Sequence, residues 1–168
     1  MPAPVISFAR VAASGGWRED VLTRWCERRG IHRDERRRRW PRGIRSIAAE
    51  LNAQADAATA TRFATQPASR MSEIVLARFE DNRRLKTSVR RLAWSDMFHP
   101  LDTLRRTAQT SRAMWRCHVA GAAASPMKHH RLTIAYSLCV LLWLVDRTTR
   151  EKLTRRFTPA LLAFMRAE

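Results

Sequence analysis

Glycine, proline, cysteine and acidic residues are scarce in this chain of 168 residues, and each scarcity excludes a class of protein. Five glycines and seven prolines are too few for the many short strands and turns of a β-sandwich or barrel. They also leave no room for a glycine-rich loop that cradles phosphate. The three cysteines, Cys26, Cys117 and Cys139, are odd in number and far apart, so neither a disulfide framework nor a zinc site is expected. We expect three buried thiols in a reducing compartment.

Acidic residues number 15 against 32 lysines and arginines, which gives a formal net charge of +17, and 29 of the basic residues are arginine. A charge of this size repels itself, so we expect the folded protein to lie against an anionic partner. Nucleic acid, acidic lipid and an acidic protein surface all qualify. The charge thus indicates the kind of partner and says nothing about the fold.

Apolar residues make up 45% of the chain and include six tryptophans and six phenylalanines. They are enough for a hydrophobic core and exclude a disordered basic tail. The length suits one domain. Because turn residues are few and apolar residues recur at helical spacing, the predicted fold class is all-α.

The spacing of apolar residues predicts about six helices. They cover about 17–29, 44–66, 70–93, 100–116, 132–145 and 148–165. The third is expected to bend or break at 80–84, where its apolar stripe drifts. Residues 31–39 are too polar for a core element, and Trp40–Gly43 is predicted to be a turn. Thr148 and Glu151 have the spacing of a capping box at the start of the last helix.

The fifth predicted helix is apolar almost all round, since only Thr133 and Ser137 are polar between Leu132 and Val145. A membrane span needs about 20 such residues, and this run is shorter. The pattern therefore predicts the central, fully buried helix of a bundle.

The first sixteen residues hold no acid and one arginine. This composition predicts either a flexible N-terminus or a weak organellar targeting segment over 1–16. The rest of the chain, 17–168, is predicted to be a single helical domain.

No catalytic constellation is evident. The five histidines form no i, i+4 pair on a helix, and the few acids lie near predicted helix ends, where carboxylates commonly cap. We therefore expect no metal, no cofactor other than a bound lipid, and no enzymatic activity.

Arginines concentrate in two zones that are candidates for docking an anionic partner. The predicted docking residues are Arg36, Arg37, Arg38, Arg39, Arg83, Arg84, Arg90, Arg91, Arg105 and Arg106. Arginine forms bidentate hydrogen bonds to phosphate and carboxylate, which suits a persistent docking surface. The alternative for Arg36–Arg39 is a solvated loop beside Asp34 and Glu35.

Several motifs, taken in order, resemble one known family. They are Gly16-Trp17, Trp40-Pro41-Arg42-Gly43, Arg78-Phe79-Glu80, Pro100-Leu101, Trp115-Arg116, and the set Lys128, Tyr136, Trp143, Leu144 and Asp146. Their order and spacing resemble those of the lipid-binding accessory proteins of coenzyme Q (ubiquinone) biosynthesis, which have a TetR-like helical fold.

The resemblance implies a TetR-like bundle, with a degenerate helix-turn-helix-like unit over 17–66 and a lipid-binding-type bundle over 70–168. It also implies a non-enzymatic, mitochondrial matrix or alphaproteobacterial protein that presents quinone precursors to a hydroxylase. The implied lipid site consists of Leu104, Ala108, Trp115, Tyr136, Val140 and Trp143. Its ligand would be a ubiquinone precursor, cardiolipin or another phospholipid. Ordinary core packing of the same side chains is the alternative.

The chain also departs from this family. Ala122–Pro126 stands where the family has an acidic loop and a Trp-Tyr pair that dock the hydroxylase. The sequence runs only a little beyond Phe164, where relatives extend into an amphipathic membrane-binding helix. The net charge is also more positive than we expect of relatives. These changes indicate a retained core with a new partner.

Three hypotheses about function follow. The first is a structural accessory subunit of a large mitochondrial assembly, either a respiratory-chain or ATP synthase complex or the ribosome, docked on rRNA, a cardiolipin-rich membrane or acidic subunits. The second is the family role in ubiquinone biosynthesis. The third is a TetR-like DNA-binding regulator. The oligomeric state is not predicted.

Overall fold

The computed structural model describes residues 4–65, 70–96, 99–118 and 125–165. Within these ranges the chain is helical and contains no strand, so the all-α prediction is confirmed. The helices are α1 (Pro4–Gly15), α2 (Glu19–Glu27), α3 (Arg33–Arg39), α4 (Ile44–Arg62), α5 (Met71–Asp81), η1 (Arg83–Leu85), α6 (Lys86–Asp96), α7 (Pro100–His118), α8 (Pro126–Val145), η2 (Thr149–Glu151) and α9 (Lys152–Phe164). They outnumber the six predicted, partly because 70–93 is divided at 82–85, which overlaps the expected break at 80–84.

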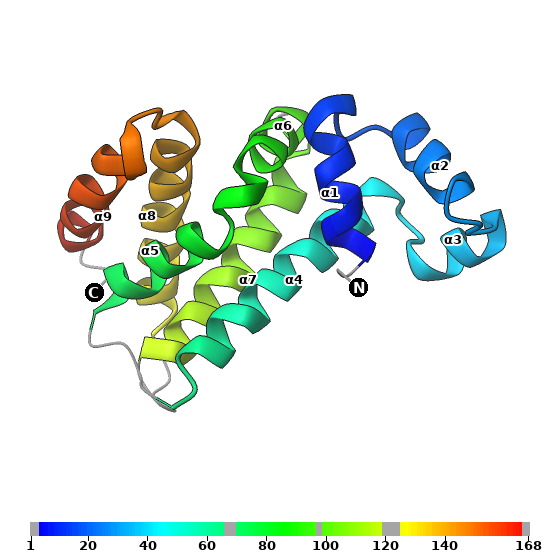
Figure 1. Ribbon diagram of the computed structural model, residues 1–168. Helices are drawn as coiled ribbons and strands as arrows, with labels where there is room; N and C mark the ends of the chain where they lie inside the picture. The colour runs from blue at the N-terminus through cyan, green and yellow to red at the C-terminus, as the bar shows by residue number, and fades with distance from the viewer. Residues whose placement is uncertain (1–3, 66–69, 97–98, 119–124, 166–168) are drawn as a thin grey trace. The chain divides into compact units, whose positions relative to one another are not determined.

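The helices form two compact units. The first consists of Met1–Ala53 and Arg84–Thr103, and the second of Gln54–Arg83 and Leu104–Glu168. The predicted division at 66–70 differs, because residues 84–103 belong with the N-terminal segment. Within the first unit α6 packs against α1 (Figure 1), and the indole N–H of Trp17 donates to the backbone carbonyl of Ser88 at 2.9 Å.

The core of the first unit is built around α1. The ring of Phe8 meets Trp17 and Trp25 edge-on, with centroids 5.4 and 5.6 Å away. Val5, Phe8 and two alanines of α1 are fully buried. The prediction of a flexible segment is therefore wrong for Pro4–Gly15, since these apolar residues form one wall of a core. Cleavage of a targeting segment stays a prediction.

The second unit is centred on α8, which packs against α9, while α5 also packs against α9 (Figure 1). The ring of Phe79 on α5 lies nearly parallel to Trp143 at 5.0 Å and to Tyr136 at 6.2 Å. The three aromatic rings are buried and join α5 to α8.

The prediction that the apolar helix is fully buried is wrong for one face of α8. Ile134, Leu138, Leu141 and Val145 follow one another at helical spacing and are exposed, while Trp143 on the other face is 2% exposed. Because α8 is apolar on nearly every side, its sequence did not indicate which side would face solvent. No helix in the described ranges has the length and hydropathy to cross a bilayer.

The start of α9 does not use the predicted capping box. Thr148 makes no side-chain cap, and Glu151 has a left-handed backbone and accepts the indole N–H of Trp143 at 2.9 Å. The cap is instead the carboxylate of Asp146, which accepts the backbone N–H groups of Thr148 and Thr154 at 2.9 and 2.8 Å. The hydroxyls of both threonines donate to the same carboxylate.

Candidate functional site

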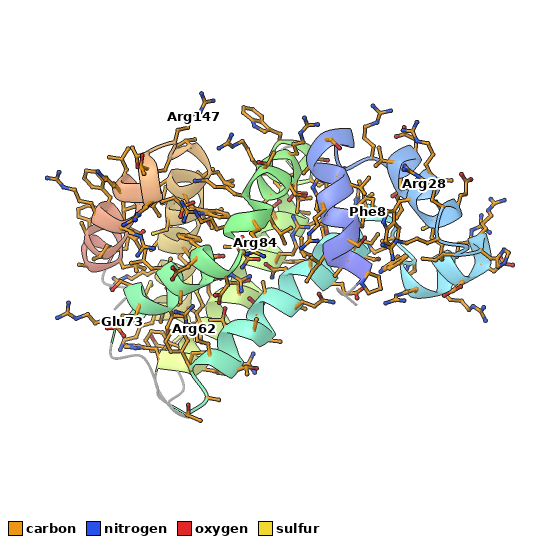
Figure 2. All side chains as sticks on the ribbon, in the orientation of Figure 1. Phe8, Arg28, Arg62, Glu73, Arg84 and Arg147 are labelled. Atoms are coloured by element: carbon orange, nitrogen blue, oxygen red, sulfur yellow. The ribbon has the colours of Figure 1, made fainter. Side chains whose placement is uncertain are left out.

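The candidate site is a set of arginines on α3 and on the loop that joins α2 to α3, all in the first unit. Its members are Arg28, Arg29, Arg33, Arg36, Arg37, Arg38 and Arg39, and we call them the arginine surface. Figure 2 shows nitrogen-tipped side chains projecting outward from these two helices, with Arg28 labelled. Residues 31–39 were predicted to be too polar for a core element, and α3 indeed buries no residue.

Since α3 buries no residue, it is anchored by the residue at its C-terminal end. Trp40 follows its last residue, is 2% exposed, and packs at 5.9 Å from Trp25 of α2. The indole N–H of Trp40 donates to Oε2 of Glu50 on α4 at 2.8 Å. The predicted turn at Trp40–Gly43 therefore serves as the anchor of α3.

Three arginines of the surface also hold the structure together. The half-buried Arg36 donates from Nη1 to the hydroxyl of Thr23 at 2.5 Å. The guanidiniums of Arg29 and Arg39 lie over the rings of Trp25 and Trp40, 5.1 and 4.9 Å from the centroids. Stacking on buried indoles fixes the position of these cations without neutralising them.

The remaining α3 arginines, Arg33, Arg37 and Arg38, are exposed. No carboxylate in the described ranges lies within ion-pair distance of them. By contrast, Asp20 of α2 pairs with both Arg18 and Arg24 at 2.9 Å, and hydrogen bonding to Arg18 lowers the pKa of that carboxyl. Within α3 itself five arginines stand against two acids, Asp34 and Glu35, and the helix is therefore positive overall.

A cavity of about 610 Å³ lies between α2 and α3. It is lined by Thr23, Cys26, Glu27, Gly30, Ile31, His32, Arg33 and Arg36. Burial raises the pKa of the Cys26 thiol, so the thiol is protonated at neutral pH and is a poor nucleophile. The cavity is lined by the cations of Arg33 and Arg36 and by the carboxylate of Glu27, so its cations outnumber its acids and it can accept an anionic group.

The other predicted docking arginines are divided between the two units. Arg84, Arg90 and Arg91 belong to the first unit, and Arg83, Arg105 and Arg106 to the second. Arg91 donates from Nη1 to the carbonyl of Ser14 at 2.6 Å, and so it fixes the end of α1. Arg105 is exposed on α7 and lines a cavity within the second unit.

The six predicted lipid-site residues lie at different places in the second unit. Tyr136 and Trp143 belong to the aromatic stack on Phe79. Trp115 is buried against His118 and His129, and Val140 is half-buried.

Leu104 and Ala108 line the same cavity. That cavity, of about 530 Å³, lies between α7 and α8 and is lined by Leu104, Arg105, Ala108, Arg112, Pro126, His129, His130 and Thr133. Its lining combines apolar side chains with two arginines. Ala122–Ala124, where the sequence departs from the docking loop of the resembled family, lies outside the described residues.

The sequence alone did not reveal a buried polar network in the second unit. Arg78 is 4% exposed, and its Nη1 lies 2.6 Å from Oδ1 of Asp56, while its Nε donates to the hydroxyl of Tyr136 at 2.9 Å. The hydroxyl of Thr110 donates to Asp56 at 3.4 Å. Arg78 and Tyr136 stand 58 residues apart in the sequence, and the structure brings them together as hydrogen-bond partners.

Burial acts on both charges of this network. It raises the pKa of the Asp56 carboxyl, although Arg78 and Thr110 act in the opposite direction. Burial alone would lower the pKa of Arg78, but Tyr136 and Asp56 raise it above its ordinary value. The guanidinium therefore stays charged inside the unit.

No protein-family model, no curated protein and no solved structure matches the chain. The arginine surface and the cavities are thus interpreted from their own chemistry.

Proposed function

We propose that this protein is a non-catalytic accessory subunit of a large mitochondrial assembly, attached to an anionic partner through the arginine surface. The assembly would be a respiratory-chain or ATP synthase complex, or the ribosome. The observation that carries the proposal is the state of α3, which buries no residue and presents Arg33, Arg37 and Arg38 without an acidic partner in the described ranges.

Keeping like charges close together on one short helix has an energetic cost. Arg33 and Arg37 are spaced i, i+4 on one helix, and like charges at this spacing destabilise it by about 0.2–0.5 kcal/mol per pair, while the spacings of Asp34 to Arg38 and of Glu35 to Arg39 act in the opposite direction. Arg36 and Arg39 add a similar i, i+3 pair. A free protein gains nothing from this repulsion, whereas an anionic partner removes it.

Gradient sedimentation of a gentle native extract tests the proposal. We expect the protein in the fractions of a large assembly, and we expect the variant Arg33→Gln/Arg37→Gln/Arg38→Gln to move to the fractions of small free proteins. Mass spectrometry of the heavy fractions would then identify the partner. A wild-type protein that sediments only as a small species would overturn the proposal.

A second candidate function is the family role in ubiquinone biosynthesis. It is supported by the cavity between α7 and α8, where Leu104 and Ala108 offer apolar contact and Arg105 and Arg112 offer cations for a polar head group. A mixed lining of this kind suits an amphiphile.

Deletion and lipid extraction test this second candidate. If it is correct, deletion lowers ubiquinone and accumulates a precursor, and purified protein carries an isoprenoid lipid. Normal quinone levels after deletion would count decisively against it.

A further inference from the structure

We propose that the partner of the arginine surface is the sugar–phosphate backbone of a nucleic-acid duplex, bound through charge and shape rather than base sequence. This inference rests on the proposed function, because it names the partner for the same surface. The arginine surface is then the part of the protein that contacts nucleic acid within the assembly.

The first support is the local charge. The arginine surface contributes seven arginines, and Asp34 and Glu35 are the acids between its first and last members, all in the first unit. Arg42 and Arg45, which follow it, pair with Asp102 at 2.8 and 3.6 Å. Counterions released from phosphates by such a surface drive binding to a polyanion. An isolated carboxylate on a protein would offer far fewer charges to match this density.

The second support is the absence of apolar side chains on the surface. All of residues 18–62 are described, and no large apolar side chain among them is exposed. A helix that lies in a membrane interface needs an exposed apolar face in addition to its cations. The arginine surface lacks that face, and this favours a phosphate polymer over a lipid surface.

The third support is the small variety of side chains with which α3 could recognise specific bases. Besides its arginines, α3 carries only Asp34 and Glu35. Operator readers place varied side chains in the major groove, with Arg or Lys pairing with guanine and Asn or Gln pairing with adenine. A helix that exposes almost only guanidiniums instead suits phosphate contacts, which position a protein without specifying sequence.

The cavity between α2 and α3 gives the surface a concave centre. Arg33 and Arg36 line it together with His32 and with one carboxylate, that of Glu27, and a guanidinium can grip a phosphate bidentately there. Because Arg36 is fixed by Thr23, part of this contact is pre-organised.

Fluorescence anisotropy of the full chain with labelled 24-base-pair DNA duplexes tests the proposal. Two duplexes of unrelated sequence should bind with affinities that differ by less than about twofold. If about four phosphates are contacted, the affinity should fall about 100-fold between 50 and 200 mM KCl. An RNA duplex as a third probe shows which duplex is preferred, and either preference supports contact with the backbone.

The variant Arg33→Gln/Arg37→Gln/Arg38→Gln should bind at least about tenfold more weakly at 50 mM KCl and should lower the salt slope by about 2–3. These side chains are exposed and unpaired within the described ranges, so the fold is expected to survive. Circular dichroism melting of the variant checks this.

A matched control removes the same charge from the second unit. It is Arg70→Gln/Arg147→Gln/Lys152→Gln, and all three side chains are exposed. We expect its duplex affinity to stay within about threefold of the wild type. An equal loss of duplex affinity in both triple variants would show that only the net charge of the protein matters. That result would overturn the proposal that a defined surface binds the duplex.

Other outcomes would also overturn the proposal. They are no duplex binding at 50 mM KCl, one sequence bound at least 100-fold tighter than the other, or preferential binding to vesicles that contain 30% cardiolipin. The second outcome would revive a DNA-binding regulator.

Nuclease treatment of the native extract separates this inference from the proposed function. If the protein leaves the heavy fractions after treatment, both stand. If the wild-type protein stays in the heavy fractions after nuclease treatment while the triple arginine variant is absent from them, the partner is not nucleic acid and only the proposed function survives. If the isolated protein binds duplexes but never enters heavy fractions, the proposed function fails and the surface assignment stands.

Discussion

The Nε–H of Arg78 donates to the hydroxyl oxygen of Tyr136 at 2.9 Å, and this bond joins α5 to α8 inside the second unit. The same guanidinium pairs with Asp56 of α4 at 2.6 Å. One buried arginine thus connects three helices. The aromatic ring of Phe79, its neighbour in sequence, stacks on Tyr136 in the same core.

This arrangement predicts an unequal response to single and double substitutions. Arg78→Met leaves the Asp56 carboxylate buried without its cation and should lower the free energy of unfolding by about 3–5 kcal/mol. The double variant Asp56→Leu/Arg78→Met removes both charges. Its free energy of unfolding should be closer to that of the wild type than the value for Arg78→Met alone. Urea unfolding of the wild type, both single variants and the double variant gives the coupling energy. Additive effects would contradict a direct pair.

The exposed face of α8 makes a second prediction. Leu141 is 57% exposed, whereas Trp143, two residues later, is 2% exposed and stacked on Phe79. Leu141→Gln should change the free energy of unfolding by less than about 0.5 kcal/mol, and Trp143→Ala should cost about 3–5 kcal/mol. Thermal melts of the two variants compare them directly. A large cost for Leu141→Gln would mean that this face is covered in the folded chain.

The contrast between these two residues shows what the sequence could predict. Apolar content and helical spacing were sufficient for the all-α class and for the break near Asn82, because these depend on local patterns. The orientation of α8 was not predictable, since a helix that is apolar on every side carries no directional signal. The Arg78–Asp56 pair was missed because its members lie on different helices and no local pattern links them. The packing of α1 was missed because an apolar, acid-poor segment also resembles a targeting sequence.

Gly43 supports a third prediction. Its φ is +55°, and an added Cβ would collide with the carboxylate of Glu19. That carboxylate accepts the backbone N–H of Ile44 at 2.9 Å and so caps α4. Gly43→Ala combines an unfavourable backbone with a displaced cap, and it should lower the free energy of unfolding by about 1–2 kcal/mol.

Gly30 provides the control for this substitution. Its φ is also positive, at +68°, but an added Cβ meets nothing within 4 Å. Gly30→Ala should therefore cost less than Gly43→Ala, because it carries the backbone penalty alone. Equal melting temperatures for the two variants would argue against the Glu19 cap.

The carboxylate of Asp146 predicts a pH dependence of stability. Burial alone would raise its pKa, but the hydrogen bonds from Thr148 and Thr154 outweigh burial and hold the pKa well below its ordinary value. A carboxyl whose pKa is lower in the folded than in the unfolded chain stabilises the fold above the unfolded pKa of about 3.9 and loses this contribution as the pH falls below it. Asp146→Asn should therefore cost about 1.5–3 kcal/mol at pH 7, and the difference from the wild type should narrow below about pH 4. Urea unfolding of both proteins at pH 7, 5 and 3 measures this, and a difference that stays constant over that range would show that the carboxylate charge is not what caps α9.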